Sequence, residues 1–372
     1  MDYNQSTPNK ERLAMSQKLG APPTNRFTVH RALSYWYIAC KADTLKQAPI
    51  AAVIWDTPLV LFRDSSGQPK CLLDRCAHRN VPLSDGTCIN GQVQCPYHGW
   101  RFNGSGDCTH IPALAGSATA QNRRVPSFPC RESQGYIWVY TDLDSSPNHE
   151  PYAFPEIDNS EYTHIRYEAD FEGTLHSTAE NILDVPHTAF LHKGLFRGGE
   201  PNLIQTVIRR YSDRADCEYI GEPRPSGLLG KFVAPDGGKV THYDRFILPS
   251  IAQVEYRLDK RHLITTSALT PISDFKTRMY AVVSVKIRSW IPFLQQMVTA
   301  FALKIVNQDK VMLAKQRKAI QEFNGENYIY TDVDVLGPSI ARLLKRATQN
   351  PIAITESPQN EPEAIINGEL LA

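Results

Sequence analysis

The spacing of hydrophobic and polar positions differs between the two halves of the chain. Between residues 35 and 140, short apolar runs such as 59–62 and 136–140 are separated by turn-forming residues. Short apolar runs bounded by turn signals are typical of β-strands. A stretch rich in proline and serine follows over residues 145–155. These patterns predict a compact all-β domain that ends at a linker.

The second half of the chain combines strand-like and helix-like patterns. Residues 164–171 alternate as a strand does, whereas residues 174–191 follow a helical spacing that Pro186 interrupts. Apolar side chains recur at helical spacing over residues 289–321, which predicts a long helix. Further strands are predicted over residues 204–210, 239–246, 263–270 and 279–288. The fold is therefore predicted to be α+β, with an all-β domain followed by an α+β domain that contains an antiparallel sheet.

These patterns also predict the domain boundaries. We expect an N-terminal segment over residues 1–33, the all-β domain over 34–145, the α+β domain over 146–346 and a flexible acidic tail over 347–372. The tail contains four Glu, three Pro and neither Lys nor Arg. Because segments of this composition bury little apolar surface, the tail is predicted to be mobile.

Composition and charge narrow the class of protein. The chain has 372 residues, 42% of them hydrophobic, and a net charge of +1. We expect a soluble globular protein, and we do not expect nucleic acid as a partner because Lys and Arg are not clustered. No apolar run is long enough for a signal peptide core or a membrane span, so the expected compartment is the cytoplasm and membrane contact is at most peripheral. Eight cysteines are too few for a disulfide scaffold in a chain of this length.

The first candidate metal site combines two mixed pairs, Cys76 with His78 and Cys95 with His98. Two thiolates and two imidazoles can hold either zinc or a [2Fe-2S] cluster. Structural zinc sites usually pair like with like, whereas mixed pairs suit two loops that each give one thiolate to one iron and one imidazole to the other. The motif resembles the Rieske domain, in which Cys-x-His-Arg is followed by Cys-Pro-x-His-Gly-Trp. The resemblance implies a [2Fe-2S] cluster held by these four residues, and of the low-potential type because the two additional cysteines of high-potential Rieske proteins are absent.

The second candidate site is built around His187 and His192. Two imidazoles and one carboxylate form the facial triad of non-haem iron oxygenases. A spacing of five residues does not align the histidines on a regular helix, so we expect the backbone to depart from α geometry between them. Asp184 lies three residues before His187 and is expected on the same helical face, as a hydrogen-bond acceptor for the imidazole.

The third ligand of this site is predicted to be Asp309. It falls on the apolar stripe of the predicted long helix, one turn after Ile305. A carboxylate on a buried face needs a partner, which an iron would supply. The alternative is a salt bridge at the end of the helix with Lys310 or Arg317. The rest of the stripe is expected to be core more often than pocket.

The arrangement Glu180-Asn181, Asp184, His187 and His192, downstream of the Rieske motif, resembles the catalytic domain of Rieske non-haem iron oxygenase α subunits, the ring-hydroxylating oxygenase family. This resemblance covers nearly the whole chain, and the late segment, residues 309–316 followed by 332–346, is similar to vanillate demethylase-like monooxygenases. The resemblance implies a helix-grip, START-like catalytic domain whose mononuclear Fe(II) is bound by His187, His192 and Asp309. It also implies that Asn181 lies near the iron. Asp184 would bridge a cluster histidine of one subunit to an iron-ligand histidine of its neighbour in a homotrimer.

The function implied is that of an O2-dependent oxygenase. Since no nucleotide-binding fingerprint and no plant-type ferredoxin cysteine run is present, electrons from NAD(P)H must arrive through a separate flavin reductase, a ferredoxin or both. We expect hydroxylation or oxidative demethylation of an apolar aromatic or polycyclic small molecule. The alternatives are a cis-dihydroxylating dioxygenase, a desaturase or an oxidative cyclase on the same scaffold. An iron–sulfur electron carrier or a zinc-stabilised binding protein would belong to a different class.

Overall fold

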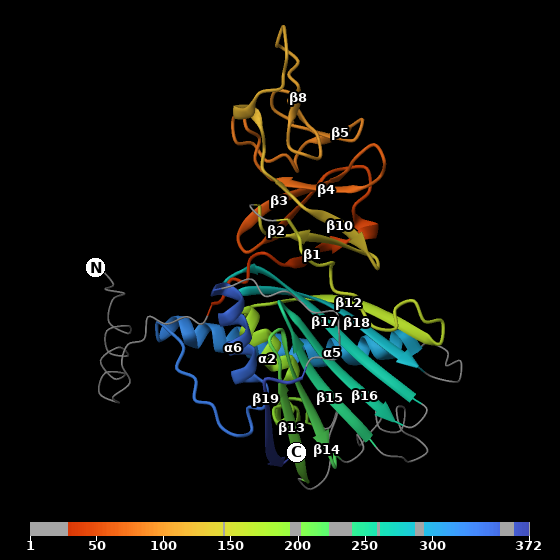
Figure 1. Cartoon of the computed structure of the whole chain (residues 1–372), viewed down its shortest axis with the longest axis vertical. Coiled ribbons are helices and arrows are strands. Elements are labelled where there is room, and N and C mark those ends of the chain that lie inside the picture. Colours follow the sequence, from red (N-terminus) through yellow and green to blue (C-terminus); the bar gives the residue numbers. More distant parts are fainter. Residues whose placement is uncertain are drawn as a thin grey trace, which may run out of the picture.

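The structure is a computed structural model of the chain. It describes residues 29–143, 146–193, 202–222, 240–258, 261–286, 294–349 and 361–371. Three small sheets occupy one end of the molecule, and one large sheet with its helices occupies the other (Figure 1). Most of the predicted N-terminal segment, 1–28, lies outside the described residues.

The N-terminal domain is all-β, as predicted, and is built from three small antiparallel sheets. The first contains β1 (Trp36–Lys41), β11 (Tyr136–Tyr140) and β10 (Cys130–Ser133). The second contains β2 (Ile50–Ile54), β3 (Thr57–Arg63), β4 (Pro69–Leu73) and β9 (Ser127–Phe128). The third contains β5 (Thr87–Ile89), β6 (Gln92–Gln94), β7 (Arg101–Phe102) and β8 (Cys108–His110). Short 3₁₀ turns, η1 (Ala42–Thr44) and η2 (Gln121–Arg123), lie in the connections.

The second domain is organised by one eight-stranded antiparallel sheet, in the order β12-β18-β17-β16-β15-β14-β13-β19. Its strands are β12 (Tyr162–Phe171), β13 (Leu203–Arg210), β14 (Arg214–Ile220), β15 (Val240–Ile247), β16 (Ile251–Leu258), β17 (Arg261–Ser273), β18 (Lys276–Lys286) and β19 (Ala364–Leu371). The helices are α2 (Leu175–Leu183), α3 (Thr188–Leu191), α5 (Leu294–Glu322) and α6 (Gly337–Gln349). This arrangement confirms the predicted α+β fold with an antiparallel sheet.

The helices place the functional residues over the sheet. Helix α2 contacts β15, β16, β17 and β18, helix α5 lies along β12, and helix α6 contacts α2 and β14 (Figure 1). Residues of β15 alternate between buried and partly exposed, which is the pattern of a sheet with one face on a core. Two of its four buried positions are the polar residues His242 and Asp244.

The two domains are joined by hydrogen bonds as well as by apolar packing. The Thr270 hydroxyl donates to the carbonyl of Ile38 at 2.7 Å, and the Tyr280 hydroxyl donates to that of Ala39 at 3.2 Å. The amide of Trp55 donates to the carbonyl of Pro271 at 2.7 Å. Side chains of both domains belong to one hydrophobic cluster. Strands β1 and β2 are therefore held against the large sheet.

The C-terminal region differs from the predicted flexible tail. Helix α6 continues to Gln349, and β19 pairs with β13 from Ala364 to Leu371. Leu370 is buried, and Glu363 forms ion pairs with Arg342 at 3.1 Å and Arg346 at 3.0 Å. Glu363 belongs to the acidic composition from which mobility was predicted, but it is paired with two arginines of α6. Residues 350–360 lie outside the described part of the chain.

Candidate metal centres and substrate cavity

The local sequence explains why His187 and His192 face one point. Helix α2 begins at the Thr174 cap, whose hydroxyl accepts from the amide of Ser177 at 3.0 Å. It ends before Asp184, whose backbone is extended, and Pro186 follows. The four-residue helix α3 then lies between the two histidines, which occupy its capping positions.

Two local expectations about this segment were wrong. The amide of Leu191 donates to the carbonyl of His187 at 2.8 Å, and that of His192 donates to Thr188 at 3.2 Å. The backbone between the histidines is therefore α-helical, and the interruption lies before them. Asp184 does not share a helical face with His187, because α2 has already ended. A turn of the chain brings the two side chains together instead.

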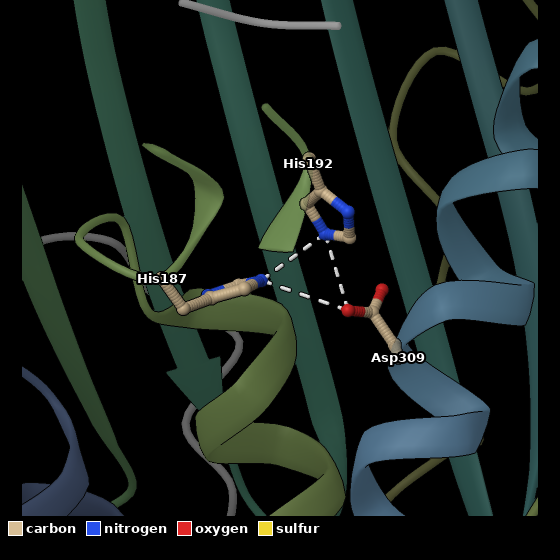
Figure 2. A group of neighbouring side chains, drawn as sticks. All are labelled: His187, His192 and Asp309. Carbon is tan, nitrogen blue, oxygen red and sulfur yellow. Dashed lines mark hydrogen bonds and ion pairs between the residues drawn. The ribbon is translucent and has the colours of Figure 1, made fainter. Parts of the chain in front are cut away.

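Three donor atoms converge at this point (Figure 2). The Nε2 atoms of His187 and His192 lie 3.2 Å apart. The Oδ1 atom of Asp309, on α5, lies 3.6 Å from the first nitrogen and 3.1 Å from the second. His192 is only 1% exposed and Asp309 9%. The structure thus brings together the three residues that the sequence predicts as a mononuclear metal site.

The donor set fits a metal ion. Asp309 Oδ1 is buried and takes part in no hydrogen bond within the described residues. At these separations, one ion can be bonded to all three atoms at about 2.0–2.2 Å. Two imidazoles and a carboxylate match the facial triad that binds Fe(II) and leaves coordination positions open. These three residues therefore form a site at which a mononuclear iron can bind.

Two neighbouring side chains orient the imidazoles. His192 Nδ1 lies 2.8 Å from Gln308 Oε1, and His187 Nδ1 lies 3.3 Å from Asp184 Oδ2. Such contacts select the tautomer whose Nε2 faces the centre. Gln308 was not predicted in this role, because side chains that are adjacent in a helix point in different directions. The contact of Asp184 with an imidazole was predicted.

The charges at the centre favour binding of a cation. Burial lowers the pKa of His187, but the carboxylates of Asp184 and Asp309 raise it more, to about 9. A metal ion would replace the proton that these carboxylates stabilise.

Asn181, on α2, lines a cavity that also contains the three donor residues. Its Oδ1 atom has no hydrogen bond among the residues described.

The second set of candidate ligands lies on two loops of the N-terminal domain that have the same backbone design. The amide of Cys76 donates to Val81 at 2.9 Å, and that of Cys95 donates to Trp100 at 2.8 Å. In each loop one residue has a positive φ, Asn80 at 62° and Gly99 at 71°. At position 99 an added Cβ would lie 2.9 Å from Pro112, so glycine fits this turn best.

The predicted ligands on these loops differ in burial. Cys76 and Cys95 are buried in the same hydrophobic cluster. The rings of His78 and His98 lie 4.5 Å apart, nearer the surface, where His98 is exposed. His78 stacks on Trp100 at 4.6 Å. The loops thus place the two imidazoles side by side and bury the two cysteines in one cluster, and the sequence predicts these four residues as one site.

A cavity of about 280 Å³ extends from the triad across the sheet. Its walls are mainly apolar and come from α2, α5 and the strands of the large sheet. The apolar stripe of the long helix, expected to be mainly core, contributes Val298, Phe301 and Ile305 to this cavity. Within the described residues, no helix is long and apolar enough to cross a membrane.

Comparison with known families decides the assignment. Residues 35–129 match the Rieske [2Fe-2S] domain, and residues 171–349 match the vanillate O-demethylase oxygenase C-terminal domain. The chain belongs to the Rieske oxygenases. Its Rieske domain is of the kind that carries a [2Fe-2S] cluster.

Individual Rieske oxygenases resemble this chain over different lengths. The oxygenase component of dicamba O-demethylase from Stenotrophomonas maltophilia is 34% identical over 202 residues, which are 53% of this chain and 59% of that protein. Chloroplastic chlorophyllide a oxygenase from Chlamydomonas reinhardtii is 28% identical over 296 residues, 76% of this chain and 43% of that protein. The chain thus spans about half the length of these curated relatives.

The solved structures agree in fold. Dicamba monooxygenase bound to 3,6-dichlorosalicylic acid superposes with a TM-score of 0.74 at 25% identity, over 86% of this chain and 98% of that chain. The similarity covers both the Rieske domain and the catalytic domain.

Proposed function

We propose that this protein is the oxygenase component of a Rieske monooxygenase system. It would use O2, and electrons from a separate ferredoxin, flavin reductase or both, to hydroxylate or oxidatively demethylate an apolar aromatic or polycyclic small molecule. The observation that carries this proposal is the position of His187, His192 and Asp309 in the wall of a mainly apolar cavity. The demethylase relative supports monooxygenation rather than dihydroxylation.

Each ligand set has a proposed role. Cys76, His78, Cys95 and His98 would hold the [2Fe-2S] cluster, and His187, His192 and Asp309 would hold the mononuclear Fe(II). The iron, when bound, supplies the redox chemistry that activates O2 with electrons from the cluster.

The protein side chains provide orientation and exclusion of water. Gln308 and Asp184 keep the two imidazoles turned toward the centre, so that three protein ligands occupy one face. The apolar side chains of α5 position the substrate body and keep bulk water away from the reacting carbon. Asn181 lies in the same wall and is proposed to contact the substrate or O2 near the iron.

We also propose that the working unit is a homotrimer in which electrons cross between subunits. The sheet that carries the cluster loops lies at the end of the molecule farthest from the catalytic helices, and the sheet β2-β3-β4-β9 lies between them (Figure 1). His98 is exposed, and the Asp184 side chain is 33% exposed beside His187. A cluster histidine from a second subunit could therefore approach Asp184 from outside.

A single-turnover experiment tests the proposed reaction. Iron-loaded protein, reduced with dithionite and then freed of it, is exposed to ¹⁸O2 with a panel of methoxyarenes and alkylarenes. We expect one ¹⁸O atom in a hydroxylated product, or a demethylated product with formaldehyde. Two ¹⁸O atoms in one arene product would instead identify a dioxygenase.

The same sample distinguishes an electron carrier. Nitric oxide should add a ferrous-nitrosyl signal to the low-temperature EPR spectrum of the reduced cluster. A normal cluster signal without that signal, after iron has been supplied, would contradict the oxygenase proposal.

A further inference from the structure

The cavity has a polar end on β15. His242 and Asp244 are each 1% exposed, face the helices and line the same cavity as the metal triad. Charged groups buried to this extent require partners, because leaving water costs them several kcal/mol. The contacts they make determine what this end of the cavity can bind.

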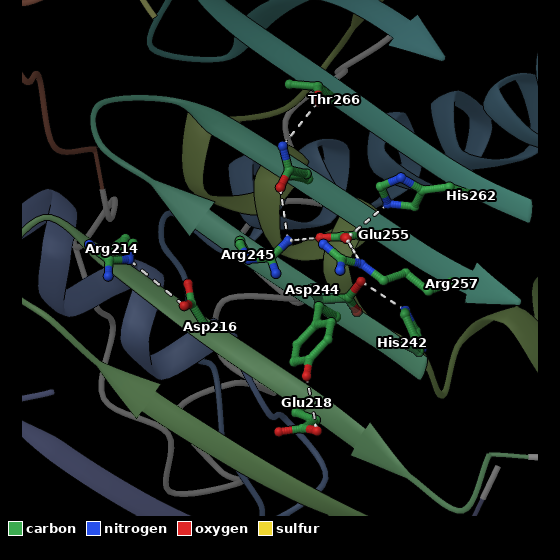
Figure 3. Close-up of polar contacts among 12 residues, drawn as sticks. Arg214, Asp216, Glu218, His242, Asp244, Arg245, Glu255, Arg257, His262 and Thr266 are labelled. Carbon is green, nitrogen blue, oxygen red and sulfur yellow. Dashed lines mark hydrogen bonds and ion pairs between the residues drawn. The ribbon is translucent and has the colours of Figure 1, made fainter. Parts of the chain in front are cut away.

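His242 is held on both of its ring nitrogens. Its Nδ1 atom lies 2.6 Å from Glu222 Oε2. Its Nε2 atom lies 3.0 Å from Asp244 Oδ1 (Figure 3). The ring is stacked between Tyr219 and Tyr256, with centroids 4.5 Å and 4.1 Å away. Burial lowers the pKa of His242, but the two carboxylates raise it more, to about 9.

This arrangement leaves His242 without a free N–H group. At neutral pH both N–H groups of the His242 imidazolium point at carboxylates, so His242 has no further N–H to donate to a ligand. Because a carboxylate can accept about four hydrogen bonds, Asp244 keeps acceptor capacity beyond its contacts with His242 and the Tyr219 hydroxyl.

Other charged groups of the cavity lie elsewhere along the sheet. Asp244 is paired with Val254, and Val254 is paired with Thr265. Arg261 is four residues before Thr265 on β17, which corresponds to about 13 Å along the strand. His262 is engaged with Glu255 at 2.9 Å. The acceptor at Asp244 is therefore not covered by a base in its own row of the sheet.

The row of residues that contains Asp244 crosses the sheet toward strand β12. Strands β16, β17 and β18 separate β15 from β12, along which α5 and its Asp309 lie. In that row the side chains facing the cavity are Val254, Thr265 and Val283. An apolar substrate body can lie across these side chains with one end at the triad and the other at Asp244.

We propose that Asp244, positioned by His242, is the specificity-determining residue of the cavity and accepts a hydrogen bond from an amine, amide or hydroxyl group of the substrate. This inference rests on the proposed function. The substrate class is then an apolar molecule that bears a hydrogen-bond donor at the end away from the oxidised carbon. Substrates with a carboxylate at that end are disfavoured, because it would face Asp244 with the same charge.

Four phenylethyl probes test the proposal: ethylbenzene, 2-phenylethanol, 2-phenylethylamine and 3-phenylpropanoate. Their dissociation constants are measured by calorimetry on the anaerobic iron-loaded protein. We expect the alcohol and the amine to bind about tenfold or more tightly than ethylbenzene, and 3-phenylpropanoate to bind more weakly than the alcohol. Asp244→Asn should weaken binding of the amine about tenfold and change binding of ethylbenzene less than about twofold.

A matched substitution serves as the control. Asp216→Asn makes the same change on the neighbouring strand β14, where the side chain faces the other side of the sheet, so it should keep the wild-type preference. The proposal is overturned if the wild-type protein binds the probes equally, binds none of them or prefers the carboxylate. It is also overturned if Asp244→Asn keeps the preference for the amine. Since calorimetry needs no turnover, a failure of the ¹⁸O2 experiment does not affect this result.

Discussion

Asp309 shows how one residue depends on side chains that are distant in sequence. Its Oδ1 atom is buried without a hydrogen bond among the described residues, and its ion-pair partners are the imidazoles of His187 and His192. The alternative predicted from sequence, a salt bridge with Lys310 or Arg317, is not needed to explain its burial. Arg317 instead contacts Glu172 at 2.9 Å.

Asp309→Ala should remove most of the mononuclear iron and leave the [2Fe-2S] spectrum unchanged, because only one of the two ligand sets loses a donor. Iron content and low-temperature EPR measure both sites in one sample. Asp332→Ala, at an exposed position, is the control and should keep both metals. Full mononuclear iron in Asp309→Ala would remove this residue from the ligand set.

Cys95→Ser should abolish the visible absorption and EPR signal of the [2Fe-2S] cluster, since the thiolate is the preferred ligand of cluster iron. The matched control is Cys88→Ser, a half-buried cysteine on β5 of the same small sheet. This control should retain the cluster signal. An intact cluster in Cys95→Ser would contradict the assignment.

His242 predicts a pH dependence of stability. Its pKa is about 9 in the folded protein against 6.5 for an ordinary histidine, because the carboxylates of Asp244 and Glu222 outweigh burial. The stabilisation is therefore complete below about pH 6.5 and is lost as the pH rises through 9. Its size is on the order of 3 kcal/mol.

Urea unfolding of the wild-type protein and of His242→Gln at pH 6.5 and 9 tests this expectation. The fall in the free energy of unfolding between the two pH values should be smaller in the variant. His164→Gln replaces a histidine whose pKa is lowered, mainly by burial, and should keep the wild-type fall. Equal falls in all three proteins would contradict the prediction.

Among the helices and strands, those with a strong hydrophobic periodicity were predicted correctly, and those with mixed patterns were not predicted. The long helix was predicted over 289–321, and α5 runs from Leu294 to Glu322. Strands β14 and β16 were not predicted, because charged residues such as Arg214 and Glu255 lie on one of their faces. Strand β19 was predicted as a flexible tail. The composition of this segment does not favour an ordered structure, but its pairing with β13 stabilises it as a strand.

The C-terminal strand predicts a sharp difference between two adjacent leucines. Leu370 is 2% exposed and Leu371 is 65% exposed. Leu370→Ala should lower the free energy of unfolding by about 2–5 kcal/mol, because it leaves a cavity where β19 packs. Leu371→Ala should change it by less than about 0.5 kcal/mol. Urea titration of both variants provides the comparison, and similar values would mean that β19 is not docked in solution.

At the scale of the whole molecule, the separation of the two ligand sets has a functional consequence. The cluster loops and the metal triad lie in different domains, with a small sheet between them (Figure 1). Hydrogen bonds and a shared hydrophobic cluster hold the domains together. Electron transfer between the sites is therefore proposed to use a contact between subunits.

Asp184→Asn tests that contact. The variant should keep both metals but slow electron transfer from cluster to iron by about 10- to 100-fold, because the carboxylate that is proposed to join the two histidines loses its charge. Single-turnover stopped-flow measures the reoxidation of the cluster. Asp332→Asn should match the wild-type rate. An unchanged rate in Asp184→Asn would contradict the bridging role.

The sequence by itself determined the residue types and their local spacing. Hydrophobic and polar spacing was sufficient to predict the α+β fold, and two histidines with a carboxylate on an apolar stripe were sufficient to predict the three donors that the structure brings together. The assignment of the mixed Cys and His pairs as cluster ligands stays a proposal. These features can be recognised from sequence because the spacing of ligand residues and the periodicity of a helix are properties of short stretches of chain. The boundary predicted near residue 145 rests on turn-forming composition in the same way and stays a prediction.

The tertiary structure alone decided which distant groups meet. Gln308 beside His192, the pairing of β19 with β13, and the inward-facing pair His242 and Asp244 all depend on contacts between segments far apart in sequence. Strand order and register set these contacts, and a short sequence pattern contains no information about either. The polar end of the cavity, on which substrate choice is proposed to depend, is therefore a property of the folded sheet.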